Sequence, residues 1–248
     1  MRHYLLLLLL ALPLCISAQV GDHRNELAVG FNGGYMMSQV AFTPKVQQKQ
    51  LGGLTGGLTL RYTCEKYFSS ICAIVGELNY AQTGWNEDIR TVDDEPVLNA
   101  AGEALSYQRR MSYVQLPVLA RLGWGRERRG FQGFFQVGPQ IGWFLSESTS
   151  KNFSLGDATQ NERASKIVAQ DTMAVENKFD YGIAVGAGLE YSIPNAGHLL
   201  LEARYYYGLG NIYGNTKSDY FGKSNFGSII VKVSYLFDII RSKNPKIK

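Results

Sequence analysis

The chain has 248 residues, a formal net charge of +4 and 12% aromatic residues. Its 25 basic and 21 acidic residues are close to balance, which argues against nucleic acid as a partner. The 27 glycines and the scarcity of helix-forming stretches are typical of an all-β chain, and no apolar run beyond Val20 is long enough for a membrane-spanning helix.

The first residues carry the pattern of a secretory signal peptide. Arg2 precedes an unbroken apolar run, Leu5–Leu12, that is too short to cross a bilayer, and Ala18 is a small residue of the kind found before a cleavage site. We therefore predict a signal peptide over residues 1–18 and an exported mature chain. A lipid anchor on Cys15 is the less favoured alternative, because Leu14 rather than a small residue precedes it.

Eight segments in chain order alternate apolar and polar residues, which is the period of a β-strand. One of them sets Ile74 and Leu78 against Glu77. The segments are Glu26–Tyr35, Leu54–Cys64, Cys72–Trp85, Tyr113–Trp124, Gly130–Phe144, Phe179–Ile193, His198–Gly210 and Gly227–Phe237. Long and short connections alternate between them, as in an up-and-down meander that is tightly turned at one end.

The alternation alone leaves open whether the apolar face of a closed sheet points inward, as in a soluble barrel, or outward into lipid. Most segments are longer than the ~5–6 residues usual in soluble sheets, which favours lipid. Aromatic residues also recur near both ends of the apolar face, as at two membrane interfaces. These girdle residues are Tyr62, Trp124, Phe131, Tyr191 and Tyr235 toward the short connections, and Tyr35, Tyr80, Trp143, Tyr181 and Tyr207 toward the long ones.

We therefore predict an all-β, eight-stranded antiparallel up-and-down transmembrane β-barrel over residues 19–237, located in a bacterial outer membrane. Residues 238–248 are predicted to form a short basic periplasmic tail. The expected partners are outer-membrane lipid, lipopolysaccharide and, during insertion, the barrel-assembly machinery. A protein partner bound through the loops or the tail is a further expectation that the residues do not identify.

The polar face carries charges of both signs. Asp180 lies toward the long connections, and the other charges lie in the half nearer the short ones: Arg61, Glu77, Arg121, Glu190, Glu202, Arg204 and Lys232. Because an eight-stranded lumen is narrow, these groups are expected to pair across it as a packed ionic plug. The alternative is a merely wet lumen in which each pair contributes little, since desolvation can exceed the Coulomb gain.

Two cysteines, Cys64 and Cys72, flank a predicted hairpin turn. If they stand opposite each other, both side chains fall on one face, and a cross-strand disulfide is compatible with an exported compartment. Two free thiols are the equally weighted alternative.

A family resemblance lies in three motifs. Tyr113–Leu119 has an aromatic–hydrophobic–polar–hydrophobic–Pro–hydrophobic pattern, Asp180–Glu190 is glycine-rich, and Val231–Phe237 is an aromatic-rich final strand. In these the chain resembles the PorT family of bacterial outer-membrane β-barrel proteins, in the small-barrel class with OmpA and OmpX. The resemblance covers nearly all of the mature chain and implies a barrel and a link to protein secretion. The chain departs from many outer-membrane barrels by continuing beyond Phe237.

The residues offer little support for catalysis or for a bound ion. Beyond the signal, only His23 and His198 remain, and both map to the short connections, which argues against a histidine-dependent site on the outer rim. The acidic stretch Glu87–Glu95 matches no EF-hand spacing and is more simply a solvated loop. We expect a non-enzymatic protein without catalytic residue, metal or cofactor, with long extracellular loops. The alternative is a small porin-like channel or transport protein.

Overall fold

The computed structural model describes residues 21–154, 162–214 and 219–242. The predicted signal peptide, residues 1–18, lies outside them, as does the part of the predicted tail from residue 243 on. Within the described ranges the chain forms nine strands and a short 3-10 turn, η3 (Ala169–Asp171). The strands are β1 (Asp22–Thr43), β2 (Gln48–Lys49), β3 (Leu51–Tyr67), β4 (Ser70–Glu87), β5 (Tyr107–Gly125), β6 (Gly130–Lys151), β7 (Phe179–Ile193), β8 (Gly197–Gly208) and β9 (Lys223–Ile240).

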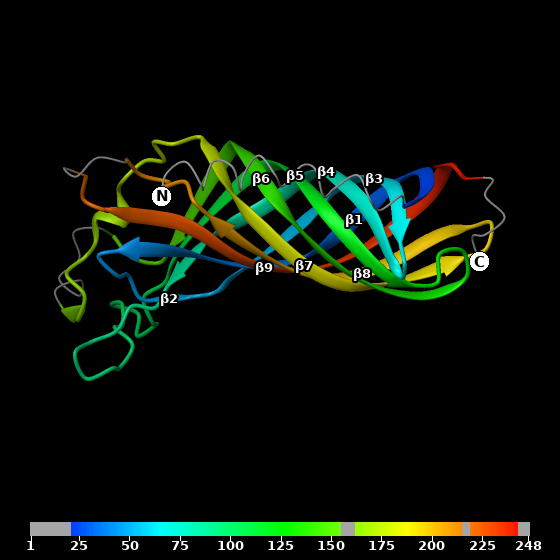
Figure 1. The fold of residues 1–248 in the computed structure, drawn as a ribbon. Coiled ribbons are helices and arrows are strands. Elements are labelled where there is room, and N and C mark those ends of the chain that lie inside the picture. The colour runs from blue at the N-terminus through cyan, green and yellow to red at the C-terminus, as the bar shows by residue number, and fades with distance from the viewer. Residues whose placement is uncertain (1–20, 155–161, 215–218, 243–248) are drawn as a thin grey trace, which may run out of the picture.

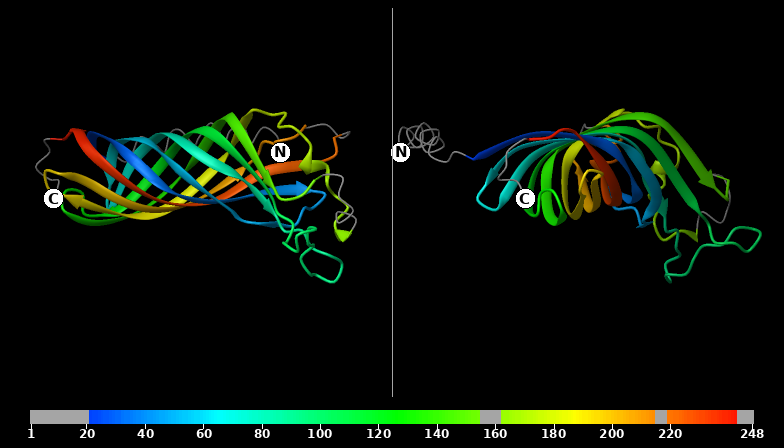
Figure 2. Two further views of the ribbon diagram at one scale, coloured as in Figure 1. Left: turned by 180° about the vertical axis from the view of Figure 1, so that it is seen from behind. Right: turned by 90° about the vertical axis from the view of Figure 1, so that its right-hand side faces the viewer.

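The strands form one antiparallel sheet that closes on itself (Figures 1 and 2). Around the ring the order is β1, β3, β4, β5, β6, β7, β8 and β9, and β9 pairs with β1 through the whole of Ala28–Thr43. The predicted all-β, antiparallel, up-and-down fold is therefore confirmed. Closure leaves no long strand of the ring with an unpaired edge, which removes the risk of edge-to-edge aggregation.

The predicted count of eight strands is not exact. Eight long strands make the ring, and the two-residue β2 is added to it in the connection between β1 and β3, where Gln48 and Lys49 pair with Glu87 and Asn86 of β4. Two residues are too few to carry an alternating pattern, so the sequence gives no sign of this strand.

The connections alternate in length as predicted (Figure 1). Three short turns lie at one end, here called the short-turn end: residues 68–69, 126–129 and 194–196. The connections at the opposite, long-loop end are residues 44–50, 88–106, 152–178 and 209–222. The segment 88–106, teal to green in Figure 1, projects beyond the rim of the ring.

Most of the strands run further than the alternating segments indicated, whereas β7 has the predicted bounds and β8 ends at Gly208, two residues early. β1 continues past Tyr35 to Thr43, and its pairing with β9 extends into what was expected to be loop. β9 itself ends at Ile240, so the predicted tail boundary at 238 is wrong by three residues: Ile240 is still paired with Leu27 of β1. Backbone hydrogen bonding between neighbouring strands can continue where the side chains no longer alternate. No helix in the described residues is long and apolar enough to span a membrane.

The two faces of the sheet have opposite character. Apolar side chains point outward, with Phe31 63% exposed, whereas charged side chains such as Glu190 point inward and are 2% exposed. A water-soluble sheet would present the reverse arrangement. This inversion is what hydrocarbon around the ring requires.

Candidate functional site

The interior of the ring, its lumen, is filled by side chains. The structure places all seven charged residues that were predicted to form the plug inside it, each less than a tenth exposed. They lie in the short-turn half of the lumen, where strands alone supply the filling. They form two clusters, described in turn below.

The first cluster contains two acids and two bases. Arg204 Nη1 and Nη2 donate to the two carboxylate oxygens of Glu77, both at 2.9 Å, and Arg204 Nε donates to Glu202 Oε1 at 2.7 Å. Lys232 Nζ contacts Glu77 and lies 3.2 Å from Glu202 Oε2. The bidentate geometry of Arg204 is the strongest form of such a pair, and the four formal charges cancel.

The second cluster is centred on Glu190. Arg61 Nη1 donates to both carboxylate oxygens of Glu190, at 2.8 and 2.7 Å, and Arg121 Nη2 donates to Glu190 Oε2. His198 lies on the other side, with Nδ1 2.6 Å from Glu190 Oε1 and Nε2 2.9 Å from Asp238 Oδ1. His198 thus connects the buried cluster to the end of β9.

Amide side chains fill the space between the charges. Asn32 Nδ2 donates to Asn79 Oδ1 at 2.8 Å, and Asn79 Nδ2 donates to Glu77 Oε2 at 2.8 Å. Gln136 Nε2 donates to Glu202 Oε1 at 2.6 Å. The carboxylates therefore accept bonds from neutral donors as well as from cations, as a buried charge requires.

Asp180 stands apart from both clusters. Its carboxylate accepts a hydrogen bond from the Tyr206 hydroxyl at 2.6 Å, and the structure gives it no ion pair within the described residues. It lies beyond both clusters, at the start of β7 and toward the long-loop end.

The long-loop half of the lumen is apolar and aromatic, which the sequence did not lead us to expect. Phe42 lies against Trp85 and Phe221, with ring centroids 5.3 and 4.9 Å apart. The signal that was available is that Trp85, Tyr113 and Tyr206 occupy inward positions of their strands. The buried residues of this outer core include Phe42, Trp85, Tyr107, Met111, Tyr113, Tyr206, Tyr213, Phe221 and Phe226.

A loop segment, residues 162–178 and here called the cap, covers the outer core. Ile167 and Met173 pack against the core. Arg109 of β5 binds the cap through Nη1, which donates to the Met173 carbonyl at 2.5 Å and also to the Tyr213 hydroxyl at 3.2 Å. Asn177 Nδ2 donates to the Asn211 carbonyl at 2.9 Å. The cap is therefore fastened both to the ring and to the β8–β9 connection.

Glu87 is buried beneath the cap, which corrects the interpretation of Glu87–Glu95 as a solvated loop. Gln170 Nε2 donates to Glu87 Oε1 at 2.7 Å, and Arg163 Nη1 lies 3.2 Å from Asp171 Oδ2. Burial and the Asp171 carboxylate together raise the pKa of Glu87 to about 8. Further along the same stretch, the residues from Asp93 to Glu95 are exposed as expected.

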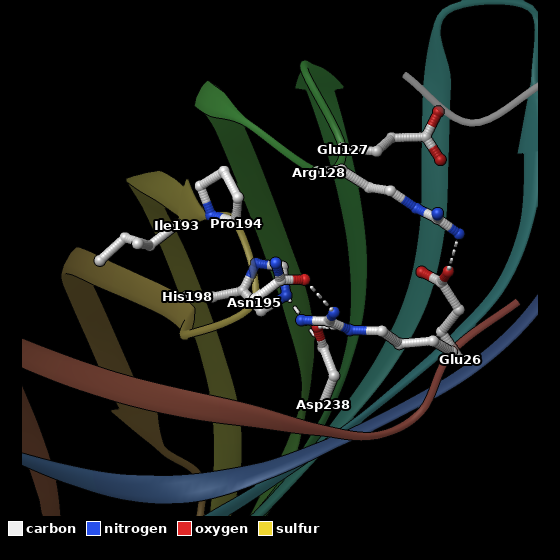
Figure 3. Close-up of a pocket in the computed structure, with 9 residues that line it drawn as sticks. Glu26, Glu127, Arg128, Ile193, Pro194, Asn195, His198 and Asp238 are labelled. Carbon is white, nitrogen blue, oxygen red and sulfur yellow. Dashed lines mark hydrogen bonds and ion pairs between the residues drawn. The ribbon is translucent and has the colours of Figure 1, made fainter.

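A cavity of about 140 Å³ opens at the short-turn end (Figure 3), and we call it the vestibule. It is lined by Glu26, Glu127, Arg128, Ile193, Pro194, Asn195, His198, Asp238 and Arg241. Arg241 Nε donates to Asp238 at 2.8 Å, and Arg128 lies 3.8 Å from Glu26. Its charged groups are thus largely paired with one another.

Glu127 closes one side of the vestibule from the β5–β6 turn. It accepts hydrogen bonds from Arg24 Nε and Lys66 Nζ, both at 2.7 Å. Burial alone would raise the pKa of Glu127, but these two cations hold it below its ordinary value. The turn is therefore fastened to β1 and β3 by an ionised carboxylate.

The cysteines do not stand opposite each other. An irregularity between Thr63 and Glu65 leaves Cys64 outside the register, so that Cys72 faces Glu65. Both cysteines are free thiols in the structure. The opposed register on which a cross-strand disulfide depends is absent because a bulge adds one residue to β3 next to the turn.

The girdle residues point outward at both ends of the ring. Nine of the ten are between 38% and 67% exposed, and the tenth, Tyr235, is half-buried, with its hydroxyl donating to the Ala196 carbonyl at 2.9 Å. In the described residues no group of three or more His, Cys, Asp or Glu side chains is arranged to hold a metal ion.

The comparisons with known proteins agree with this geometry. A family model described as "Outer membrane protein beta-barrel domain" matches residues 17–214. No curated protein matches the chain in sequence.

Several solved structures are similar in fold. OprG of Pseudomonas aeruginosa has a TM-score of 0.40 and 13% identity over 88% of this chain and 98% of that chain. Neisserial surface protein A has a TM-score of 0.39 and 10% identity over 85% of this chain and 97% of that chain. Ail of Yersinia pestis has a TM-score of 0.34 and 16% identity over 86% of this chain and 99% of that chain. These similarities are too low to carry an argument about function.

Proposed function

Because the chain belongs to the outer membrane protein β-barrel domain family, and so lies in the bacterial outer membrane, we propose that it is a non-enzymatic barrel with a sealed lumen. In this role it presents its long loops to the exterior and acts by interaction rather than by passage of solutes. In barrels of this class the short turns face the periplasm and the longer loops face outward.

The observation that carries the proposal is that both halves of the lumen are filled. Arg204 is 3% exposed in the short-turn half, and Phe221 is fully buried in the long-loop half. A continuous water path would have to displace paired charges at one level and packed aromatic rings at the other. The sealed barrel is therefore favoured over the alternative, a small porin-like channel or transport protein.

Planar-bilayer recordings on refolded protein test this proposal. The wild type is expected to give no steady ion current. A variant with four substitutions, Glu77→Ala, Glu202→Ala, Arg204→Ala and Lys232→Ala, combined with removal of the cap, is the comparison, since it removes the first cluster from the short-turn half and the cover of the outer core from the long-loop half. A steady current through the wild type would favour the channel and end the sealed-barrel proposal.

The surroundings and partners follow from the membrane location. We infer that the outward apolar face contacts outer-membrane lipid and lipopolysaccharide, and that the chain passes through the barrel-assembly machinery during insertion. The projecting segment 88–106 exposes Val92 to 85% together with Asp93 and Asp94, and it is the surface best placed to meet a protein partner. Copurification from native membranes, with and without residues 90–96, tests this.

The finer relation to the PorT family, and with it a secretion role, rests on the motif Tyr113–Leu119 and its companions. Copurification of secretion components with the tagged protein would support that role, and their consistent absence would leave the generic barrel as the answer.

A further inference from the structure

The β5–β6 turn, residues 126–129 and here called the arginine turn, concentrates positive charge at the short-turn end. Arg126, Arg128 and Arg129 are all exposed. The other two short turns, residues 68–69 and 194–196, contain no charged residue. Among the three short turns, the positive charge is therefore confined to this one.

The residues of the arginine turn divide into two pairs by their contacts. Glu127 and Arg128 face the vestibule, where Glu127 is bonded to Arg24 and Lys66, and Arg128 donates to the Ser242 carbonyl. Arg126 and Arg129 have no side-chain hydrogen bond or ion pair within the residues that the structure describes. Two guanidinium groups are thus left available at the surface.

The backbone of the turn sets the position of Arg126. Gly125 and Gly130 have φ angles of 137° and 107°, in the region that glycine adopts without strain. The Arg126 amide donates to the Phe131 carbonyl at 3.1 Å and closes the turn. A Cβ on Gly130 would lie 3.1 Å from Arg126 Cδ, so the Arg126 side chain passes directly over this glycine.

The girdle fixes the depth of the turn in the membrane. Trp124 precedes Gly125 and Phe131 follows Gly130, and both rings are exposed on the lipid-facing side. Trp124 Nε1 donates to Ser70 Oγ at 2.8 Å, which orients its ring. Aromatic girdles lie at the level of the lipid head groups, so Arg126 and Arg129 lie at that level too.

We propose that the arginine turn binds the phosphodiester of an anionic phospholipid in the periplasmic leaflet of the outer membrane. The planar guanidinium group matches the oxygens of a phosphate with paired donors. Two unpaired cations favour a head group of net negative charge over a zwitterionic one, because the cationic amine of a zwitterionic head group is repelled by the two arginines. This inference uses the membrane location and the periplasmic position of the short turns, and it is independent of whether the lumen conducts.

Native mass spectrometry of refolded protein in a neutral detergent tests the proposal. Phosphatidylglycerol and phosphatidylethanolamine with identical acyl chains are titrated separately, and bound lipid is counted. The wild type is expected to prefer phosphatidylglycerol, and R126Q/R129Q is expected to bind it on the order of tenfold more weakly. The matched control, K45Q/K151Q, removes two exposed lysines at the long-loop end and is expected to bind as the wild type does.

Three results would overturn the proposal. These are equal binding of the two lipids by the wild type, unchanged phosphatidylglycerol binding by R126Q/R129Q, or displacement of the lipid by an equal concentration of inorganic phosphate, which would make this a site for free phosphate. Heat-modifiable mobility on gels establishes that each variant is folded. R126K/R129K, which keeps both charges, is expected to retain part of the preference.

Discussion

The two halves of the lumen are filled by side chains of different chemistry. In the short-turn half, Glu77, Glu190 and their cationic partners reach across the ring and neutralise one another. In the long-loop half, aromatic rings from strands and loops pack together under the cap. Short turns cannot fold back into a barrel, so long charged side chains from the strands must span it, whereas long loops can bring their own apolar residues inside.

The largest effect is expected from breaking the charged half. Arg204→Leu removes four hydrogen bonds to Glu77 and Glu202 and leaves Lys232 as their shared cation. An uncompensated buried charge costs about 3–5 kcal/mol, so urea unfolding and the heat-modifiable gel shift should both move toward the unfolded form. Lys45→Leu, at an exposed lysine, is the control and should change little. An unaltered unfolding midpoint for Arg204→Leu and for Glu77→Gln would contradict the ionic plug.

Breaking the aromatic half is expected to act locally. Phe221→Ala empties a fully buried site beside Phe42 and should weaken the outer core by about 3–4 kcal/mol. The cap should then open more often, so that trypsin cleaves after Arg163 and Lys166 faster while the heat-modifiable barrel persists. Tyr220→Ala, at a neighbour that is 50% exposed, is the control. Loss of the whole barrel in Phe221→Ala would show that the two halves are one cooperative unit.

Protonation of Glu87 is expected to change how stably the cap is docked over the long-loop half. Its pKa is raised from an ordinary 4.5 to about 8, so the docked cap favours the protonated acid. Its contribution is therefore complete below about pH 4.5 and is lost as the pH rises through the raised pKa. Hydrogen-exchange protection factors in residues 162–178, which are corrected for the intrinsic base-catalysed exchange rate, should fall between about pH 5 and pH 8.5. Glu87→Gln, which mimics the protonated acid, should flatten this dependence, and the same slope in both proteins would refute the assignment.

The smallest effect is expected at the boundary between the halves. Asp180→Asn keeps an acceptor for the Tyr206 hydroxyl and breaks no ion pair of the described residues. We expect a change within about 1 kcal/mol in urea unfolding. The reference is Glu190→Gln, which weakens contacts to Arg61, Arg121 and His198. If Asp180→Asn were as damaging as Glu190→Gln, Asp180 would have to belong to the ionic clusters of the short-turn half.

Much of the fold was predictable because its signals are local. Alternation in stretches such as Tyr113–Trp124 assigns each side chain to a face, and the lengths of the connections separate the two ends. The inward charges, including Arg61 and Glu190, were identified from parity alone. The choice between a disulfide and two free thiols stayed open, because a one-residue bulge at Cys64 leaves no mark in the sequence.

The sequence by itself determined the outer-membrane barrel and which residues face its interior, since period and segment length reside in consecutive residues. Only the tertiary structure decided which side chains contact one another inside the ring. Glu77 and Arg204 are 127 residues apart in the chain, and the cap that buries Glu87 comes from a loop 83 residues away. Such contacts depend on ring closure and on how far each loop folds back over the rim, and neither is set by any local pattern.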